Sequence, residues 1–460
     1  MAACVRAEIA LVSAHLAVRG ALTDAVRAEL DASARSVEPS EVYAEEEKTR
    51  HNIRALVNVI KGKVPASTAP LVHLGATSVD ILDTALSWRV RGAFNEVVIP
   101  LLSKLELLLC DFAEREAQTP QVGRTHGQHA VPITVGFAIA EYVSRLGKSL
   151  QEIKRLALNL RGKLAGAVGS YNATAMIVKD PEDLERRYLA ELGLEPSEHS
   201  TQLVEPEYLL RLLLECNTAF GIIANLADDL RHLQRSEIGE LREGFAADQV
   251  GSSTMPQKRN PWNSEHVKSL WKAFMPRVIT FYMDQISEHQ RDLSNSASQR
   301  FIADYIAGFS MAIERMISVI EGLGVDRERL QQNLNGNAGI SGGVLAEPAY
   351  ILLAESGVSD AHEVIRKLTL KAERENLSFA QSLASDSESL KRIGAKMAEL
   401  GLIDCTSGSP AAADPSDAAL AWFEKPERYC GLAAKKALEL AQKYRKVANE
   451  YIRNTNRQGD

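Results

Sequence analysis

The densest cluster of polar side chains in the sequence is GSSTMPQKRNPWNSEH, residues 251–266. It places serine hydroxyls, the Lys258 ammonium and the Asn260 amide in one short segment between two long helical stretches. These groups suit the recognition of carboxylates and the stabilisation of negative charge. The alternative is a plain connection between helices, but such connections have about two to eight residues and need no such chemistry. We therefore predict that this segment binds an anionic substrate.

A second cluster, VGRTHGQHAVPITVG, covers residues 122–136 and presents His126 between two glycines. An imidazole has an ordinary pKa of about 6.5, so a histidine in such a setting can transfer protons near neutral pH. His126 and His129 could also be structural or bind a metal. No carboxylate or thiol stands beside them, and two histidines alone do not complete a zinc site. We predict proton transfer at His126 and no metal.

The third cluster, VHLGATSVD at residues 72–80, leads into the first long helical stretch. Thr77 and Ser78 stand where a helix begins, so their hydroxyls can cap its free N–H groups. The same helix N-terminus can instead hold an anionic group, because its N–H groups and its dipole attract negative charge. Both interpretations stay open from the residues alone.

Long helices must position these clusters. Apolar residues recur at spacings of three and four through five long stretches, interrupted only by isolated glycines or prolines. A helix of about thirty residues is about 45 Å long, and such rods can bury their apolar stripes only against each other. We predict an all-α protein built on a long bundle, with long helices at residues 84–116, 135–164, 208–241, 265–292 and 298–323.

Shorter helices and more polar connections flank this bundle. A break rich in Gly and Asn, NLNGNAGISGG, occupies residues 333–343, and no alternating strand pattern reaches a convincing length. FGIIANLADDL, residues 220–230, carries apolar side chains on more than one helix face, which favours burial against further copies of the chain. We predict a homo-oligomer with three helical domains, at residues 1–80, 81–334 (the bundle) and 335–460.

The composition excludes several classes of protein. The 460 residues carry a formal net charge of −7, which argues against a nucleic-acid partner. The five cysteines lie far apart without a CxxC pair, which excludes a disulfide scaffold and a cysteine zinc site. No stretch reaches the roughly 18 apolar residues of a membrane span. Glu8 interrupts the first apolar segment, so we expect an amphipathic helix rather than a leader, and a cytoplasmic protein.

Taken together and in order, HLGATSVD, GRTHGQ and GSSTMPQKRNP resemble the signature segments of the fumarase/aspartase superfamily of lyases. Within that superfamily, the sequence is most similar to the adenylosuccinate lyase family. The resemblance extends from about residue 40 to 300 and more weakly to the end. Its supporting segments are TRH at 49–51, DTA at 83–85, DLRHLQRSE at 229–237, RDLSNSASQR at 291–300 and VLAEP at 344–348.

The resemblance implies a fold, an assembly and an activity. Members are all-α homotetramers with a helical-bundle core, and their active sites draw on three subunits, which would place His126 and Ser252 on different chains. The implied reaction releases fumarate by anti β-elimination of a C–N bond, without a cofactor. The implied substrates are succinylated purine nucleotides of purine biosynthesis: adenylosuccinate gives AMP, and SAICAR gives AICAR.

The resemblance also implies roles for individual residues. Ser252 would be the general base that removes the Cβ proton, and His126 the general acid that protonates the departing nitrogen. Lys258 and Asn260 would hold the substrate carboxylates, and Glu265 would lie near the acid histidine. The other implied contacts are His51, His73, Thr77, Ser78, Thr125 and Gln202 with the substrate, and Arg291, Ser296 and Arg300 with its phosphate.

The sequence departs from the family pattern on the leaving-group side. It lacks an early Arg-Tyr pair, since its first tyrosine is Tyr43, and it has Asn52 and Asn295 where the family commonly has Asp and His. Lyases of the argininosuccinate lyase, aspartase, fumarase and carboxymuconate cycloisomerase types would keep the same acid and base, so they remain alternatives. A non-catalytic scaffold with a lyase fold is an alternative of another class, against which the intact Ser252 and His126 speak.

Overall fold

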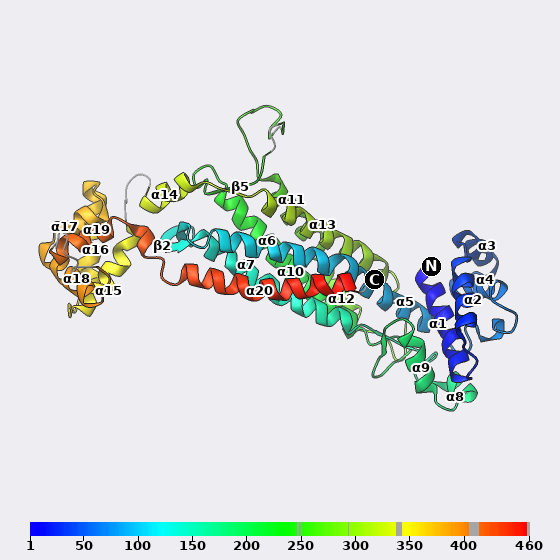
Figure 1. Ribbon diagram of the computed structural model, residues 1–460. Helices are drawn as coiled ribbons and strands as arrows, with labels where there is room; N and C mark the ends of the chain where they lie inside the picture. Colours follow the sequence, from blue (N-terminus) through cyan, green and yellow to red (C-terminus); the bar gives the residue numbers. More distant parts are fainter. Residues whose placement is uncertain (246–247, 250, 293, 337–342, 404–413, 458–460) are drawn as a thin grey trace.

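The structure, a computed structural model, describes residues 1–245, 248–249, 251–292, 294–336, 343–403 and 414–457. The chain is elongated, with a bundle of long helices between two groups of shorter ones (Figure 1). The N-terminal helices lie at one end and the helices of residues 346–423 at the other. The segment that leads to residue 261 projects from the side of the bundle. The predicted all-α fold is confirmed.

The N-terminal end is a cluster of short helices around α1 (Ala2–Val18). Residues 7–16 of α1 are all buried, so this helix is not amphipathic as we expected. The hydrophobic core here also includes residues from 164–194, which come much later in the sequence. The other helices are α2 (Asp24–Arg35), α3 (Pro39–Thr49), α4 (Asn52–Lys63), η1 (Ala69–Leu71), α8 (Asn172–Ile177) and α9 (Pro181–Ala190).

The central bundle contains the largest hydrophobic core. Its helices are α5 (Ser78–Ala93), η2 (Phe94–Val98), α6 (Ile99–Arg115), α7 (Val135–Leu158), α10 (Glu207–Leu233), α11 (Trp262–Phe274), α12 (Arg277–Met283), η3 (Ser298–Phe301), α13 (Ile302–Glu321) and α20 (Ala433–Arg457). Although α20 ends the chain, it packs along α6 and α7. Gly147 of α7 makes room for it, because a Cβ at this position would lie 2.2 Å from the Tyr444 ring.

The third hydrophobic core lies among the short helices of residues 345–423. The predicted division into domains 1–80, 81–334 and 335–460 stays a proposal. Two segments pack against a different domain from the one in which this division places them. Residues 164–194 join the N-terminal core, and α20 joins the bundle. α14 (Arg327–Asn335) contributes Leu330 to the bundle core. The remaining helices are η4 (Gly343–Leu345), α15 (Ala346–Glu355), α16 (Ala361–Glu375), α17 (Phe379–Ala384), α18 (Ser387–Glu399), α19 (Pro415–Phe423) and η5 (Pro426–Arg428).

Prolines shape two of the long helical rods. α5 continues into α6 through the π-helical turn η2, in which the Ile99 N–H bonds to the Phe94 carbonyl. Pro100 explains this turn, because it has no N–H and its ring crowds the carbonyl four residues earlier. Pro276 separates α11 from α12, so the single helix expected at 265–292 is broken. The helices expected at 135–164, 208–241 and 298–323 are present but shorter.

The expectation that the chain has no strands was wrong. β1 (Pro120–Thr125) and β2 (Gln128–Thr134) form an antiparallel hairpin. His126 and Gly127 make its two-residue turn with φ values of 55° and 73°, the pair of positive values that suits a twisted hairpin. Pro132 disguised the second strand, because proline is rare inside strands. The other strands have two residues each: β3 (Arg161–Gly162) pairs with β4 (Glu195–Pro196), and β5 (Leu241–Arg242) with β6 (Gly324–Val325).

The apolar side chains of residues 220–230 are buried within one chain, because α10 lies in the core of the bundle. The apolar 18-residue window of this helix has a mean hydropathy of 1.4 and is 56% buried, as in the core helix of a bundle. These residues therefore do not need further copies of the chain to bury them, and they do not support the predicted oligomer. Exposed apolar side chains lie instead on and near α12: Ile279, Tyr282, Met283, Ile286 and Phe301.

Glu106 is a buried acid in the middle of α6. Its side chain is fully buried, and neither carboxylate oxygen has a hydrogen-bond partner among the described residues. Burial raises the pKa of this carboxyl group well above its ordinary value of 4.5. Above about pH 4.5 the unfolded chain releases a proton that the folded chain keeps, and this release favours unfolding. The contribution of Glu106 to the free energy of unfolding is therefore complete below about pH 4.5 and is lost as the pH rises towards the folded-state pKa.

We expect Glu106→Gln to raise the melting temperature, because the amide cannot ionise in the unfolded state. The gain over the wild type should increase between about pH 5 and about pH 8. Thermal unfolding in matched buffers at constant protein concentration measures it. A gain that stays the same across this range would mean that Glu106 does not hold a proton in the folded chain.

Candidate active site

A buried carboxylate anchors the hairpin that carries His126. Glu240 is fully buried and accepts two hydrogen bonds from the Arg124 guanidinium, at 3.0 Å and 2.5 Å. The amides of Gln121 and Asn333 donate to the same carboxylate at 2.7 Å and 2.8 Å. A bidentate ion pair with two further donors compensates the carboxylate for its lost hydration. The base of the hairpin is therefore held in one orientation, and the turn beyond it has a defined direction.

The turn of the hairpin exposes His126. Its ring makes no hydrogen bond within the described part of the chain, and Thr125 precedes it with an exposed side chain. His129 lies opposite Arg124, and burial together with this cation lowers its pKa. His129 lies on β2 and not in the turn, so His126 is the histidine that the hairpin presents at its tip. An imidazole at the tip of an anchored hairpin can deliver a proton to a group that approaches it.

The 251–260 segment closes on itself at a narrow neck. A Cβ on Gly251 would lie 2.1 Å from the Lys258 carbonyl oxygen, so only glycine allows this approach. The Asn260 side chain donates to the Gly251 carbonyl at 3.2 Å. At the base, the Glu243 carboxylate accepts the Ser264 N–H at 2.8 Å, within the first turn of α11. One of the predicted anion-binding groups, the Asn260 amide, therefore also holds the neck together.

The Ser252 hydroxyl oxygen accepts hydrogen bonds from two backbone groups. The Met255 N–H donates at 3.1 Å and the Thr254 N–H at 3.4 Å. A serine is a weak base unless negative charge on its Oγ is stabilised, and fixed N–H donors supply such stabilisation. The geometry of this turn therefore fits proton abstraction by Ser252.

A cleft of about 600 Å³ lies between this segment and the C-terminal end of α10. Lys258 and Asn260 line it from the segment, and Arg231 lines it from the helix. Glu265 lies on the first turn of α11, with its carboxylate 4.0 Å from the Arg231 guanidinium. Arg235, which is paired with Glu237, and Arg259 also line the cleft, so its lining carries more positive than negative side chains and attracts anions.

Thr77 and Ser78 begin α5 at the other end of the bundle. Thr77 is the N-cap residue, and its N–H donates to Asp80 Oδ2 at 2.7 Å. Thr77 therefore occupies the predicted N-cap position, in a capping box with Asp80. Both side chains keep some exposure, so an anion at this helix N-terminus remains a prediction.

Two of the predicted histidines lie in the N-terminal region. The His73 ring bonds through Nδ1 to the Glu8 carboxylate at 2.7 Å. His51 is the N-cap residue of α4, and its Nδ1 accepts the Arg54 N–H at 3.2 Å. His51 therefore has a structural role, and its exposed position leaves its predicted substrate contact as a hypothesis.

The structure brings Gln202 and Arg291 together. The Arg291 guanidinium donates to the Gln202 side-chain oxygen at 3.2 Å, and the Gln202 N–H donates to the Gln290 carbonyl at 3.3 Å. Ser296 and Arg300 follow on the same segment, and both have exposed side chains. The predicted phosphate contacts thus share one segment, but only Arg291 is tied to another predicted residue.

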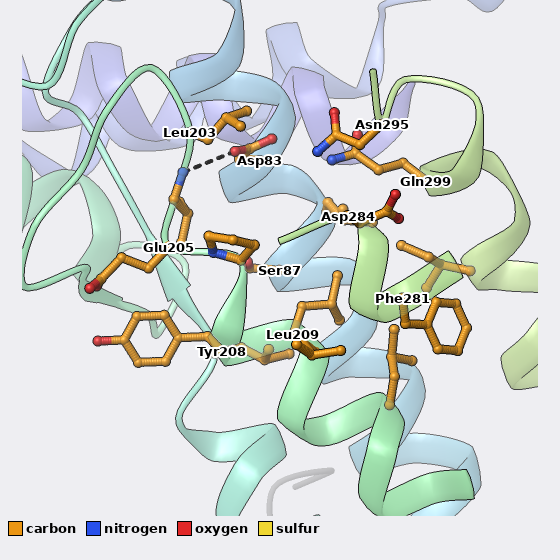
Figure 2. Close-up of a pocket in the computed structure, with 17 residues that line it drawn as sticks. Asp83, Ser87, Leu203, Glu205, Tyr208, Leu209, Phe281, Asp284, Asn295 and Gln299 are labelled. Atoms are coloured by element: carbon orange, nitrogen blue, oxygen red, sulfur yellow. Dashed lines mark hydrogen bonds between the residues drawn. The ribbon is translucent and has the colours of Figure 1, made fainter. Parts of the chain in front are cut away.

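Behind this segment, a small cavity of about 80 Å³ lies against α5 and α10 (Figure 2). Asp83 accepts the Val204 N–H at 3.1 Å, the bond that Figure 2 marks with a dashed line. Burial raises the pKa of Asp83 to about 6, although this N–H and the charge of Arg291 act in the opposite direction. Asn295 also lines the cavity. Asp83 thereby ties the segment that contains Gln202 to the first long helix.

The predicted site residues form two groups at opposite ends of α10. Gln202 precedes the N-terminus of this helix, and Gln234 at its C-terminus donates to the Arg259 carbonyl at 3.2 Å. A helix of 27 residues is about 40 Å long. One chain therefore does not bring the Gln202 and Arg291 group together with the segment that contains Ser252. His51, His73, Thr77 and Ser78 lie on or beside the N-terminal helices and the start of α5, and Ser296 and Arg300 follow Arg291, so these six are assigned to the first group. Thr125 and His126 lie on the hairpin that Glu240 anchors, and Lys258, Asn260 and Glu265 line the cleft at the C-terminal end of α10, so these five are assigned to the second.

Several residues that hold the site in place were missed in the sequence. Glu240 is 116 positions from Arg124, and no local pattern connects them. Asp83 lies within the DTA segment, but nothing in the sequence indicates that it holds the Val204 N–H. Glu8 carried a signal, since it is an acid within an otherwise apolar segment.

Comparisons with known proteins place the chain among lyases. It matches the family described as Lyase over residues 2–273 and the one described as Adenylosuccinate lyase C-terminal over residues 287–402. The adenylosuccinate lyase of Pyrococcus horikoshii is 35% identical over 335 residues, 72% of this chain and 73% of that protein. The adenylosuccinate lyase of Archaeoglobus fulgidus is 33% identical over 399 residues, 84% of this chain and 86% of that protein.

Two solved structures share the fold. The 3-carboxy-cis,cis-muconate lactonizing enzyme from Pseudomonas putida superposes with a TM-score of 0.77 at 23% identity, over 97% of this chain and 94% of that one. A fumarate lyase from a Mesorhizobium species gives a TM-score of 0.77 at 21% identity, over 96% and 94%. At these identities the two structures show only that the fold is shared. The comparison of function rests on the adenylosuccinate lyases, which are more similar in sequence.

Proposed function

The chain belongs to the adenylosuccinate lyase family of the fumarase/aspartase superfamily, and on this premise we propose that it cleaves adenylosuccinate to AMP and fumarate, and SAICAR to AICAR and fumarate, in purine biosynthesis. The observation that carries the proposal is the Ser252 hydroxyl, which accepts two backbone N–H groups within the segment whose Lys258 and Asn260 line the cationic cleft. These are the requirements of a base that works next to a carboxylate. We propose a cytoplasmic enzyme that needs no cofactor.

The proposed reaction is an elimination across the Cα–Cβ bond of the succinyl group. Ser252 takes the Cβ proton, and the electron pair of that C–H bond moves into the neighbouring carboxyl group, which then carries two negative charges. Lys258 and Asn260 stabilise these charges, and a single such donor contributes about 3 kcal/mol. The pair then forms the C=C bond of fumarate as the C–N bond breaks, and His126 protonates the departing nitrogen.

The other predicted residues bind the substrate in this proposal. Arg291 and Arg300, with Ser296 between them, bind the nucleotide phosphate, because guanidinium groups match its oxygens. Glu265 acts near His126. The remaining contacts are His51, His73, Thr77, Ser78, Thr125 and Gln202.

We further propose a homotetramer whose active sites are shared between subunits. A separation of about 40 Å along α10 exceeds the reach of one nucleotide, so groups at its two ends meet on one substrate only if they come from different chains. The exposed apolar residues on and near α12 support an assembly, because such patches mark contact surfaces. Closed symmetry would then form several equivalent sites.

The direct test of the activity is incubation with adenylosuccinate, followed by the ultraviolet change as fumarate leaves. Parallel reactions contain SAICAR, argininosuccinate, aspartate or malate at the same concentration. Turnover of argininosuccinate, aspartate or malate without turnover of adenylosuccinate would overturn the proposed substrate. Inactivity with all five would favour the scaffold alternative.

The family resemblance, which implies that His126 and Ser252 of one site come from different chains, predicts complementation between two inactive variants. Ser252→Ala and His126→Gln are each expected to be inactive, but subunits mixed in equal amounts and reassembled should regain activity. If the two residues of a site come from different chains, about one quarter of the sites in a random mixture receive both intact side chains. The activity of the mixture, compared with each variant dissociated and reassembled alone, measures this. No recovery would contradict the assignment of His126 and Ser252 to different subunits.

A further inference from the structure

Glu8 is a buried acid in the N-terminal helix that the proposed mechanism does not use. Its side chain is fully buried, and it lies within a run of buried residues on α1. Burying a carboxylate in such surroundings is costly unless it is paired. Its Oε1 meets His73 Nδ1 at 2.7 Å across 65 positions of sequence. This bond joins α1 to one of the predicted substrate-binding residues.

The backbone around His73 also indicates a constrained position. His73 has a φ of +61°, a conformation that is uncommon for a residue with a side chain. The adjacent Leu74 carbonyl accepts a hydrogen bond from His15 Nε2 at 2.8 Å. His15 is fully buried, burial lowers its pKa, and its Nδ1 lies 3.0 Å from an Arg19 guanidinium nitrogen. A neutral His15 ring with its hydrogen on Nε2 satisfies both contacts.

Glu8 and His15 lie seven residues apart, which is two helical turns, so they share one face of α1. Glu8 bonds to the ring of His73, and His15 bonds to the backbone carbonyl of the next residue, Leu74. The helix therefore acts as a fixed support behind the segment that leads into α5.

The Glu8 bond determines which nitrogen of His73 faces outward. A carboxylate can only accept, so we assign the hydrogen of this bond to His73 Nδ1. The His73 side chain is 21% exposed, and its Nε2 has no hydrogen-bond partner within the described residues. The ring is thus held at one nitrogen and open at the other, which is the arrangement of a histidine that a buried carboxylate orients for a ligand.

We propose that Glu8 is a positioning residue of the active site, which orients the His73 ring so that Nε2 meets the substrate. This inference rests on the proposed function, because it takes His73 as a substrate contact. Glu8 itself touches no substrate, since it is fully buried behind the ring. Its effect on catalysis must therefore pass through His73.

The test is the Glu8→Gln variant of the full-length protein. The amide is close to the carboxylate in size, but it can donate to Nδ1 as well as accept from it, so the ring loses its fixed orientation. KM should rise by about 10- to 100-fold, the range for a lost hydrogen bond to a charged group, with kcat nearly unchanged. Glu8→Asp, whose carboxylate is drawn back by one methylene, should also raise KM and provides a second variant.

Glu106→Gln is the matched control. Glu106 is buried as completely as Glu8 but lies in α6 of the bundle and has no contact with His73. Its replacement should leave KM unchanged. A merely structural role of Glu8 would lower the folded fraction and hence the apparent kcat, again without moving KM.

The His73→Gln background shows whether Glu8 acts through the ring. Adding Glu8→Gln to His73→Gln should raise KM no further, because the two changes remove one shared contact. An additional rise of the same factor in this background, or an unchanged KM in folded Glu8→Gln and Glu8→Asp, would overturn the proposal. All KM values are measured with the superfamily substrate that the wild type turns over. A wrong substrate assignment therefore shows in the wild-type assay, whereas a wrong role for Glu8 shows only in the variants.

Discussion

Replacing Ser252 by alanine should lower kcat by about 10²- to 10⁴-fold, the range expected for loss of a general base. The hydroxyl oxygen accepts the Met255 and Thr254 N–H groups, and alanine has no oxygen to place there. KM should change little, because the groups that bind the substrate remain. Steady-state kinetics with adenylosuccinate measure both quantities, and gel filtration shows whether the assembly is preserved.

The next residue supplies a matched control for this variant. Ser253 is exposed, and Ser253→Ala removes the same hydroxyl one position away. It should retain nearly all of the activity. If Ser253→Ala is the inactive variant and Ser252→Ala is active, the base has been assigned to the wrong serine. If both are active, a group outside this segment removes the proton.

Lys163→Met should lower the free energy of unfolding by about 3–5 kcal/mol, the usual effect of removing one partner of a buried ion pair. The side chains of Lys163 and Asp80 are both fully buried and bonded to each other, and Lys163 Nζ also donates to the Gly166 carbonyl at 3.2 Å. Without the ammonium, the Asp80 charge stays in the core with only N–H groups as partners. Urea denaturation at constant protein concentration measures the loss.

Two further variants complete this experiment. Lys391→Met, at an exposed position of α18, should leave the stability nearly unchanged. Adding Asp80→Asn to Lys163→Met should restore part of the loss, because it removes the stranded charge. A fully additive double variant would mean that the two groups do not interact. The result also concerns the active site, since Asp80 accepts the N–H of the capping residue Thr77 at 2.7 Å.

The local geometry of two polar segments depends on residue types a few positions apart. The two ends of the 251–260 segment are held together by residues of the segment itself. Gly251 lies against the Lys258 carbonyl, and its own carbonyl accepts a hydrogen bond from the Asn260 side chain. The chemistry of a segment that folds on itself is visible in its sequence. The same holds for Thr77 at the start of α5, because capping depends on residues a few positions apart.

The supports of the site could not be predicted in this way. Glu240 holds the hairpin of His126 through Arg124, Asp83 holds the Val204 N–H, and Glu8 holds His73. Each partner lies many positions away, and an acid gives no local sign of which distant donor it will meet. Only packing of the helices brings these pairs together.

The sequence by itself determined the class of fold, most of the long helices and the residue types gathered in the three polar segments, because helical periodicity and turn chemistry act over a few residues. The tertiary structure decided that α20 returns to the bundle, that residues 120–134 form a hairpin, and that the two groups of site residues lie at opposite ends of α10. The physical reason is that an apolar stripe specifies only that it must be buried, whereas the partner that buries it follows from the packing of the whole chain.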